Sequence, residues 1–486
     1  MSNGKVLIVG AGPAGLTAAY ELGKHGVKGA ILEADHVVGG LARTVERDGY
    51  RFDIGAHRFF TKVSEIEQLW EEMLGEPLVR CPRLTRILYG NKLYDYPLKA
   101  GNALKNMGIV AAAGCVLSYL KACAYPIPNP RNFEDWVTNQ FGAKLFNMFF
   151  KSYTEKVWGC PCTKIGADWA AQRIKGLNLG QAIRESLFGK KKGRTVTTLI
   201  EEFKYPRQGA GQLWEACARE IQANGWIVST RSRVTRIEIV GGKVKTLDAV
   251  TEDGRTTTYL VEHLLSSMPL RTLLLSMNPK PPEQITACAS ALAYRDFLLV
   301  ALVIDKPNIF PDNWIYIHSP HVRVGRIDNF GNWTADMIPD PQTSCLVMEY
   351  FVFEDDELWS STDDKLIDLA YRELGAIGLA VGKLIKGYVV RVPKAYPIYD
   401  PGYKERLDVI RQWLSCNVSN LQCIGRNGQH RYNNQDHSMA TALIAARNIV
   451  SGANRDPWEV NEDAEYHEIV KTERQAPLTP AKLAIS

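Results

Sequence analysis

The sequence predicts a mixed α/β fold, and three observations lead to this prediction. The chain opens with a continuous apolar strand over residues 6–9, a glycine-rich turn and a helix, the order typical of a βαβ unit with a parallel sheet. Residues 100–200 have mostly helical periodicity. Residues 290–400 instead contain several runs rich in β-branched and aromatic residues, which favour an antiparallel sheet.

The glycine-rich turn predicts a dinucleotide site. Gly10, Gly12 and Gly15 have G-x-G-x-x-G spacing, in which the glycines allow a tight turn, approach of a pyrophosphate and close helix–strand packing. The following helix presents free N–H groups and its positive dipole end to phosphates. Glu33 ends the second strand, 23 positions after Gly10, where its carboxylate can accept a ribose hydroxyl. This fingerprint alone does not distinguish FAD from NAD.

Further elements follow in order. Residues 64–74 are predicted to be a helix, with Ser64 as N-cap and Glu67 completing a capping box. Alternation over 86–96, with Gly90-Asn91 at its centre, predicts a β-hairpin.

The region after the hairpin is predicted to be helical over 102–121, 133–153 and 167–174. Its most apolar run, 108–120, is shorter than the ~20 residues that cross a bilayer. We therefore expect a buried helix there rather than a membrane span.

Near the end of the chain, a strand and a glycine turn at Gly425 precede a helix predicted over 439–450, with Asp436 and Ser438 as caps. A second helix N-terminus therefore points toward a bound group. In a flavoprotein that group is the N1–C2=O edge of the isoalloxazine, which gains negative charge on reduction.

These patterns divide the chain into domains. We expect a discontinuous dinucleotide-binding domain over 1–75, 203–285 and 415–455, and a helical domain over 100–200. An antiparallel-sheet domain is expected over 77–99 and 286–414, and a disordered tail over 473–486.

Composition narrows the class of protein. The 486 residues are 45% hydrophobic and 23% charged, which is ordinary for a globular protein, and the net charge of +5 suits an anionic ligand without requiring one. No nucleic-acid module and no metal site are predicted. With no secretory signal and ten scattered cysteines, we expect a cytoplasmic protein with reduced thiols.

The motifs resemble FAD-dependent enzymes of the amine oxidase/protoporphyrinogen oxidase superfamily. The likeness rests on the opening motif, on Gly39-Gly40-Leu41-Ala-Arg43, on Phe52-Asp-Ile-Gly-Ala-His57 and on the segment from Gly425 to Ser438. It implies a Rossmann-like, p-hydroxybenzoate hydroxylase-like FAD domain with a helical insertion and an antiparallel-sheet substrate domain. The cofactor-binding positions it implies are Gly10, Gly12, Pro13, Ala14, Gly15, Glu33, Ala34, Gly40, Leu41, Arg43, Gly55, Ala56, His57, Val234, Met268, Gly425, Arg426, Gln435, Asp436, His437 and Ser438.

Within that superfamily the sequence is most similar to UDP-galactopyranose mutases, especially the eukaryotic type. Three stretches carry this likeness, 156–174, 203–214 and 432–438. It implies a nucleotide-sugar pyranose/furanose mutase in which N5 of reduced FAD is the nucleophile at the anomeric carbon, with NAD(P)H or another donor reducing the flavin. The implied catalytic residues are His57, Arg173 and Tyr432, and the implied substrate-binding residues are Trp158, Arg173, Arg323, Arg326, Tyr432 and Asn434.

Two departures from the mutase pattern keep alternatives open. The mutases have Gly-Gly-His where this chain has Gly55-Ala56-His57, and their second phosphate-binding arginine aligns with neither Arg323 nor Arg326 unambiguously. The alternative is an FAD-dependent oxidase, desaturase or dehydrogenase of an amine, isoprenoid or tetrapyrrole. Its apolar pocket would be lined by Phe59, Phe60, Trp314 and Tyr316. A third hypothesis is a flavin-binding module without catalysis.

Overall fold

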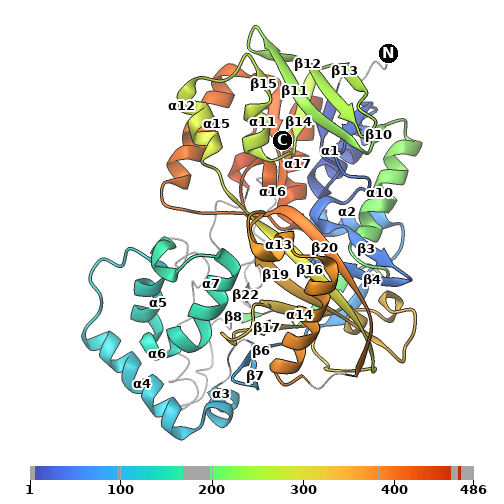
Figure 1. Ribbon diagram of the computed structural model, residues 1–486. Coiled ribbons are helices and arrows are strands. Elements are labelled where there is room, and N and C mark those ends of the chain that lie inside the picture. Colours follow the sequence, from blue (N-terminus) through green and yellow to red (C-terminus); the bar gives the residue numbers. More distant parts are fainter. Residues whose placement is uncertain are drawn as a thin grey trace.

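The computed structural model describes residues 6–96, 98, 100–167, 197–199, 201–379, 382–460 and 469–471. A parallel sheet lies in the upper half of the molecule as drawn in Figure 1. This sheet has five strands in the order β10-β2-β1-β14-β21, and every neighbouring pair is parallel. Its strands come from three distant parts of the chain. They are β1 (Val6–Val9), β2 (Gly29–Leu32), β10 (Ile227–Ser229), β14 (His263–Ser266) and β21 (Leu421–Cys423).

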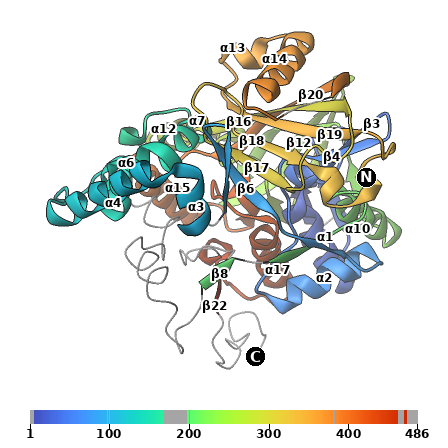
Figure 2. The same cartoon turned by 90° about the horizontal axis from the view of Figure 1, so that it is seen from below.

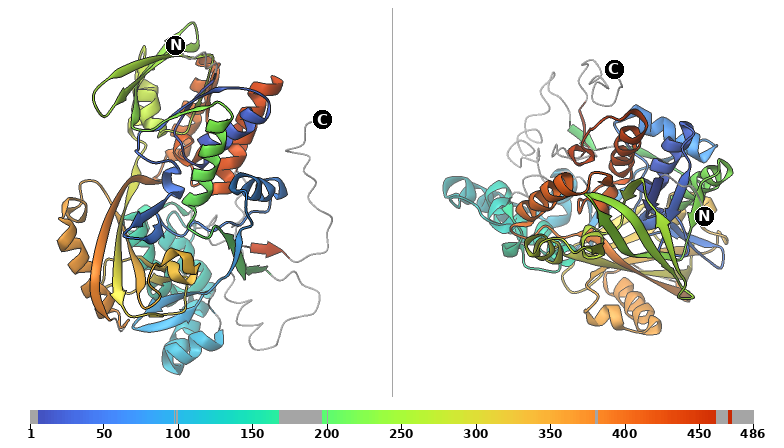
Figure 3. Two further views of the ribbon diagram at one scale, coloured as in Figure 1. Left: turned by 90° about the vertical axis from the view of Figure 1, so that its right-hand side faces the viewer. Right: turned by 90° about the horizontal axis from the view of Figure 1, so that it is seen from above.

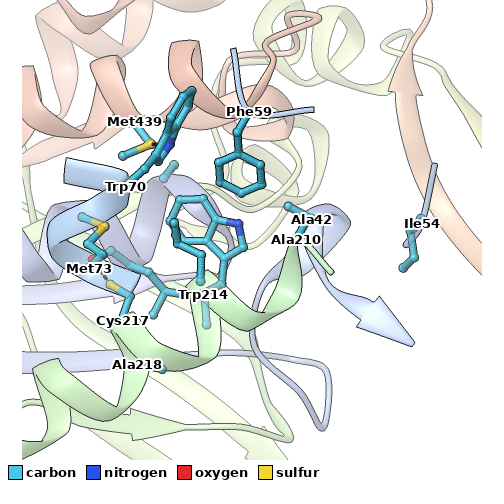
Figure 4. Packing of buried hydrophobic residues seen from close by; sticks show 14 of the residues in the cluster. Ala42, Ile54, Phe59, Trp70, Met73, Ala210, Trp214, Cys217, Ala218 and Met439 are labelled. Carbon is cyan, nitrogen blue, oxygen red and sulfur yellow. Dashed lines mark hydrogen bonds between the residues drawn. The ribbon is translucent and has the colours of Figure 1, made fainter. Parts of the chain in front are cut away.

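Four helices pack with this sheet and with one another: α1 (Pro13–Lys24), α2 (Ser64–Leu74), α10 (Gly211–Ala223) and α17 (Gln435–Ser451). Figure 4 shows their shared core, where Phe59 meets Trp70 edge to face with ring centroids 5.0 Å apart. The Trp70 indole N–H donates to Met439 Sδ on α17 at 3.0 Å. Trp214 of α10 is fully buried in the same cluster. The core thus joins the first, middle and last parts of the chain.

A four-stranded sheet of order β13-β12-β11-β15 extends this region. It consists of β11 (Ser232–Val240), β12 (Lys243–Thr251), β13 (Thr256–Leu260) and β15 (Met277–Asn278). Nearby helices are α11 (Leu270–Leu275), α12 (Glu283–Ser290), α15 (Tyr403–Asn417) and α16 (Gly425–Gly428). Short paired strands are β3 (Thr44–Arg47) with β4 (Tyr50–Asp53), β5 (Val79–Pro82) with β9 (Glu202–Tyr205), and β8 (Thr197–Leu199) with β22 (Ile469–Lys471).

The third large sheet has seven strands in the order β20-β16-β19-β18-β17-β6-β7. It comprises β6 (Thr85–Tyr89), β7 (Lys92–Asp95), β16 (Tyr294–Asp305), β17 (Trp314–Ile317), β18 (Arg326–Asn329), β19 (Ser344–Val352) and β20 (Lys383–Pro397). All its pairs are antiparallel except β17 with β6, which is parallel, so the expected antiparallel sheet is slightly mixed. In the left view of Figure 3 its yellow and orange strands lie below the parallel sheet.

The two faces of the seven-stranded sheet pack against different parts of the protein. On one face, Leu298, Met348 and their neighbours pack under α14 (Asp363–Ala376), with α13 (Glu357–Ser360) close by in sequence. On the other face, Phe297 and Val347 belong to the same core cluster as the helices of the dinucleotide-binding region. This second face therefore packs against the dinucleotide-binding region. The predicted α/β fold is confirmed, while the exact domain division stays a prediction.

The predicted hairpin is confirmed, and Gly90 and Asn91 both have positive φ, +56° and +57°. The helix predicted over 102–121 is instead two helices, α3 (Ala100–Met107) and α4 (Ile109–Ala124). They meet at Gly108, φ +80°, with a bend of 116°. Only Cys115 and Ala122 of α4 are buried, so the prediction of a buried helix was wrong.

None of the described helices, taken singly, has the length and apolar character to cross a bilayer; only the bent pair α3–α4 passes that test jointly. The helix predicted over 133–153 is divided into α5 (Phe133–Phe141), α6 (Ala143–Phe146), a π-helical turn (Asn147–Lys151) and α7 (Ser152–Trp158). The first break lies at Gly142, φ +81°, where a Cβ would come within 2.7 Å of the α4 backbone at Ser118. The helix predicted over 167–174 and the tail 473–486 lie outside the described residues, except for Ala167.

The capping box predicted for α2 was wrong. Ser64 is the first helical residue, and the N-cap is Val63, whose side chain offers no hydrogen bond. The helix starts where Val63 is extended, and the Val63 carbonyl accepts the N–H groups of Ile66 and Glu67 at 3.1 and 3.2 Å. The remaining short 3-10 turns are Gly40–Ala42, Cys162–Lys164, Phe330–Asn332, Ala335–Met337 and Pro457–Glu459.

Candidate functional site

The glycine turn at the start of α1 admits no side chain at two positions. A Cβ on Gly15 would lie 1.9 Å from the Gly10 carbonyl oxygen. A Cβ on Gly10, whose φ is +98°, would lie 2.2 Å from Ser267 Oγ. The turn is thus held against both β14 and its own helix. Pro13 occupies the first helical position, and Ala14 follows it in the buried first turn.

The second glycine motif packs directly on the first. The Gly39 N–H donates to the Ala11 carbonyl at 2.8 Å, and a Cβ on Gly40 would lie 3.1 Å from Gly12 Cα. Arg43 donates to the Gly40 carbonyl at 3.1 Å and pairs with Asp35 at 3.2 Å, so it holds this turn closed. Leu41, between them in sequence, packs against the main core. The phosphate contact expected of Arg43 stays a prediction.

We call the two glycine turns, residues 10–15 and 39–43, the cradle. Glu33 lies beside it, directly after the last residue of β2. Its carboxylate accepts the Ala11 N–H at 2.6 Å and the Asp35 N–H at 2.8 Å. Burial raises the pKa of Glu33, while these two hydrogen bonds oppose the rise. A carboxylate has about four acceptor sites, so acceptor capacity remains for ribose hydroxyls. Ala34, the next residue, is exposed.

Segments from the middle and the end of the chain close the cradle. A Cβ on Gly425 would lie 2.9 Å from the Ala14 Cβ, and the Gly425 N–H donates to Thr441 of α17 at 2.9 Å. Val234 is buried in a cluster with residues of β1 and β2, and Met268 packs against the same cluster. Three stretches far apart in sequence therefore converge on the N-terminus of α1.

The N-terminus of α17 is capped differently from the prediction. Asn434 is the N-cap and forms a capping box with His437, whose Nδ1 accepts the Asn434 N–H at 3.2 Å. Asp436 and Ser438 lie within the first turn, so their prediction as caps was wrong. The sequence signal for this cap is an Asn three residues before a side chain that can accept, and Asn434 carries it, although the resemblance implies a substrate contact for Asn434 instead. Gln435 accepts the Trp214 indole N–H at 2.9 Å, and its buried Nε2 has no partner among the described residues.

His57 follows the turn Gly55-Ala56 and faces two arginines. Its Nε2 lies 2.7 Å from the Ile54 carbonyl oxygen, which only accepts, so Nε2 carries the proton. Burial first, then the positive charges of Arg426 and Arg326, lower the pKa of His57 to about 3. The imidazole is therefore neutral near pH 7.

Arg326 of β18 reaches this turn from the seven-stranded sheet. A Cβ on Gly55 would lie 3.2 Å from Arg326 Nη2 and 3.5 Å from Glu349 Oε1. Arg326 Nη2 donates to Glu349 Oε1 at 2.6 Å, and its Nε lies 2.6 Å from Glu349 Oε2. Strand pairing sets this contact, because Arg326 is directly opposite Glu349 across β18 and β19.

A second carboxylate, Asp328, lies beside the pair with its Oδ2 3.5 Å from Arg326 Nε. Asp328 is fully buried, and burial together with the neighbouring Glu349 raises its pKa well above the usual range. We infer that Asp328 is protonated, which leaves one positive and one negative charge in the cluster.

Two stacked tyrosines lie next to this cluster. Tyr396 of β20 and Tyr432 have ring centroids 5.7 Å apart and planes 14° from parallel. The Arg426 guanidinium lies 4.7 Å from the Tyr432 ring and 5.5 Å from the Tyr396 ring. It also donates to the carbonyls of Asn433 and Ala395, at 2.9 and 3.1 Å. These two hydrogen bonds connect the segment before α17 to β20.

Trp158 and Tyr153, both on α7, connect the helical region to the surroundings of the two stacked tyrosines. Trp158 stacks on Tyr399 at 6.4 Å, and the Tyr399 hydroxyl accepts the Tyr432 N–H at 2.6 Å. Tyr153 stacks on His318 at 4.8 Å, with planes 7° apart. We call His57, Arg326, Glu349, Tyr396 and Tyr432 the polar wall.

Other predicted residues lie elsewhere. Arg323 is exposed and lines a pocket of about 610 Å³ with Lys156 and Arg295; no residue of the polar wall lines that pocket. Its backbone N–H donates to Glu373 on α14 at 2.6 Å, on the far side of the sheet. Arg173 lies outside the described residues. Phe59 and Trp314, proposed for an apolar pocket, are fully buried in the core.

The sequence reasoning missed three residues of this region: Asp53, Glu349 and Tyr396. Asp53 is fully buried and accepts Thr44 Oγ1 and Tyr205 hydroxyl, both at 2.6 Å, so it anchors β4 beside the His57 turn. A carboxylate inside an apolar strand, as in Phe52-Asp-Ile54, was an available signal. Glu349 sits likewise in the apolar run of β19.

Comparisons with known proteins agree with this fold. The model of the family "Flavin containing amine oxidoreductase" matches residues 13–421. A crystal structure of reduced UDP-galactopyranose mutase superposes with a TM-score of 0.81 over 95% of this chain and 97% of that one, at 20% identity, which concerns the fold. A protoporphyrinogen oxidase from Nicotiana tabacum chloroplasts is 22% identical over 458 residues, covering 85% of this chain and 79% of that protein.

Other curated relatives are matched only in part. A 1-hydroxycarotenoid 3,4-desaturase of Flavobacterium sp. is 37% identical over 71 residues, which is 14% of this chain and 14% of the desaturase. The family match implies FAD, and the cradle fits it. The glycines leave room for a pyrophosphate, Glu33 retains acceptor capacity for a ribose, and the N-terminus of α1 offers N–H groups to the phosphates.

Proposed function

The chain belongs to the family of flavin-containing amine oxidoreductases, and from that premise we propose that it is a nucleotide-sugar pyranose/furanose mutase-like enzyme. The observation that carries the proposal is the polar wall. An oxidase of an isoprenoid or a tetrapyrrole needs an apolar pocket, whereas this wall offers an arginine, two tyrosine hydroxyls and a neutral histidine. Such groups suit an anionic, hydroxyl-rich substrate.

Four of the five residues of the wall have a stated part in the proposal. When bound and reduced, FAD supplies N5 as the nucleophile at the anomeric carbon. Tyr396 and Tyr432 donate hydrogen bonds to the departing diphosphate, and Arg326 supplies positive charge beside it. Glu349 holds the Nε–Nη2 edge of Arg326 in a fixed orientation and leaves Nη1 outside the ion pair. Arg173 remains a proposed second diphosphate ligand.

The alternative, an FAD-dependent oxidoreductase of an amine, isoprenoid or tetrapyrrole, also has an observation in its favour. Glu349 balances the charge of Arg326, so the wall has less positive charge than a site built for a diphosphate would need. The relatives matched in sequence include a protoporphyrinogen oxidase and desaturases, as well as ferredoxin–NADP reductases. As part of the mutase proposal we place the enzyme in the cytoplasm, which suits its ten unpaired cysteines.

The test is anaerobic incubation with candidate nucleotide sugars, following flavin absorbance and analysing products. The mutase proposal predicts isomerised sugar only after the flavin has been reduced, with no net change in its oxidation state. Bleaching of the oxidised flavin by a substrate would instead establish net oxidation and replace the mutase by the oxidoreductase.

A pair of arginine variants tests the wall itself. Arg326→Lys keeps the charge but loses the bidentate fork, so we expect nucleotide-sugar affinity to fall about tenfold, or about 1.4 kcal/mol, while FAD is retained. Arg323→Lys is the matched control, because Arg323 is exposed and lies away from the wall. Equal affinities of the two variants would remove Arg326 from the substrate site.

A further inference from the structure

Helix α4 presents its largest apolar side chains to the outside. Ile109, Val110, Val116, Leu117 and Leu120 are between 40% and 88% exposed. At helical spacing, these five residues lie on one side of the helix, and we call them the stripe. Helix α4 lies at the outer edge of the molecule in both Figure 1 and Figure 2.

The side of α4 that packs inward is less apolar than the outward stripe. Its buried residues are Cys115 and Ala122, and Ser118 accepts the Lys144 N–H of α6 at 3.1 Å. A helix at a water-facing surface shows the opposite arrangement, with large apolar residues inward and polar ones outward. The inversion indicates that the outward stripe has an apolar partner.

Neighbouring segments extend the stripe into a patch. Leu104 of α3 is 49% exposed, Tyr125 just after α4 is 78% exposed, and Ile127 is also exposed. We call these three residues, together with the five of α4, the α3–α4 surface. Exposed apolar patches of this extent mark interaction sites.

The charge around this surface identifies the partner. Between Tyr96 and Phe133 the sequence has no Asp or Glu, although the chain as a whole has 53. Lys105, Lys121 and Arg131 in this stretch are all exposed. An apolar stripe whose own segment, residues 97–132, carries only positive charge complements an anionic lipid surface, whereas a second copy of the same segment would meet like charge.

We propose that the α3–α4 surface binds the surface of a bilayer that contains anionic phospholipid. The stripe enters the boundary between headgroups and acyl chains, Lys105 and Lys121 contact lipid phosphates, and Tyr125 lies at headgroup level. The geometry favours lying on the membrane over crossing it, because α3 and α4 have 8 and 16 residues and meet at a bend of 116°. This proposal does not depend on the proposed mutase activity.

The test is co-sedimentation of the FAD-loaded full chain with phosphatidylcholine vesicles, with and without phosphatidylglycerol. We expect binding to the anionic vesicles that weakens with added salt. The double variant Leu117→Ser/Leu120→Ser should bind on the order of tenfold more weakly. Its matched control is Val240→Ser/Leu260→Ser, which replaces two residues 55% and 79% exposed on β11 and β13. Retained flavin absorbance shows that each variant is folded.

The variant Lys105→Gln/Lys121→Gln separates the two contributions. It should lose the salt-sensitive part of binding to anionic vesicles and keep any binding to phosphatidylcholine alone. Absence of wild-type binding to either vesicle, or equal binding by the stripe and control variants, overturns the proposal. A wild-type dimer in gel filtration that the stripe variant abolishes, without vesicle binding, would assign the surface to a second copy instead.

Discussion

The dinucleotide cradle and the polar wall face the same site but are built by different means. The cradle is made of backbone, and its shape depends on glycines such as Gly10 and Gly15 that leave no room for a Cβ. The wall is made of side chains, and it depends on buried charge at Arg326 and Glu349. We therefore expect substitutions in the cradle to act through steric clash with the backbone, and substitutions in the wall to act through an unbalanced buried charge.

The largest effect is expected in the cradle, for Gly15→Ala. The new Cβ would lie 1.9 Å from the Gly10 carbonyl oxygen, a backbone atom that moves only with the turn. We expect loss of bound FAD and a fall of about 3 kcal/mol or more in the free energy of unfolding. The ratio of flavin to protein absorbance and urea unfolding measure both effects.

Gly23→Ala in the same helix is the control. Its Cβ would meet only the Trp226 side chain, at 3.6 Å, and alanine favours a helix over glycine by about 1 kcal/mol. It should bind FAD normally and be equally or more stable. If Gly15→Ala also keeps FAD, FAD binding by the cradle does not depend on the absence of a Cβ at position 15.

The wall should respond to charge, and Glu349→Gln tests this. The substitution leaves the Arg326 guanidinium buried without its counter-charge, which costs about 3 kcal/mol of unfolding free energy. FAD should remain bound, because no cradle residue changes. Urea unfolding of the loaded protein and its flavin spectrum give the two readouts.

Glu252→Gln provides the matched surface pair. Glu252 pairs with Arg231 at 3.0 Å, and both side chains are more than half exposed. Its loss should cost below about 1 kcal/mol. Similar losses of unfolding free energy for the Glu349 and Glu252 variants would mean that water screens the charges of the wall. The wall would then not depend on buried charge, in contrast to what we infer.

The same difference explains what the sequence could predict. The glycine motifs are contiguous and act through the backbone, so their spacing was sufficient to place the turn, α1 and Glu33. Glu349 is 23 residues from Arg326, and only the register of β18 against β19 brings them together. No local pattern carries that register, so the ion pair could not be predicted.

The helix boundaries show a second reason why parts of the structure could not be predicted from the sequence. The break of the 102–121 helix occurs at Gly108, a residue whose tolerance of positive φ was visible in the sequence. The exposure of α4 was not visible, because periodicity shows which residues share a face but not which face is packed. At α17 the wrong cap was chosen because Asn434, Asp436 and Ser438 are all good capping residues, and only the backbone geometry decides among them.

Between pH 7 and pH 5, the smallest effect concerns the acid sensitivity of the wall at His57. The folded-state pKa of about 3 lies below the ordinary value of 6.5, so the unfolded chain binds a proton that the folded one does not. The stabilisation is therefore complete above pH 6.5 and is lost as the pH falls toward 3, by up to about 1.4 kcal/mol per pH unit. Urea unfolding between pH 7 and pH 5 should show a shallower loss for His57→Gln than for the wild type. The substitution His25→Gln, at the exposed C-cap of α1, controls for removing an imidazole. If both variants have the wild-type slope, burial and the neighbouring arginines do not hold His57 neutral in the folded protein.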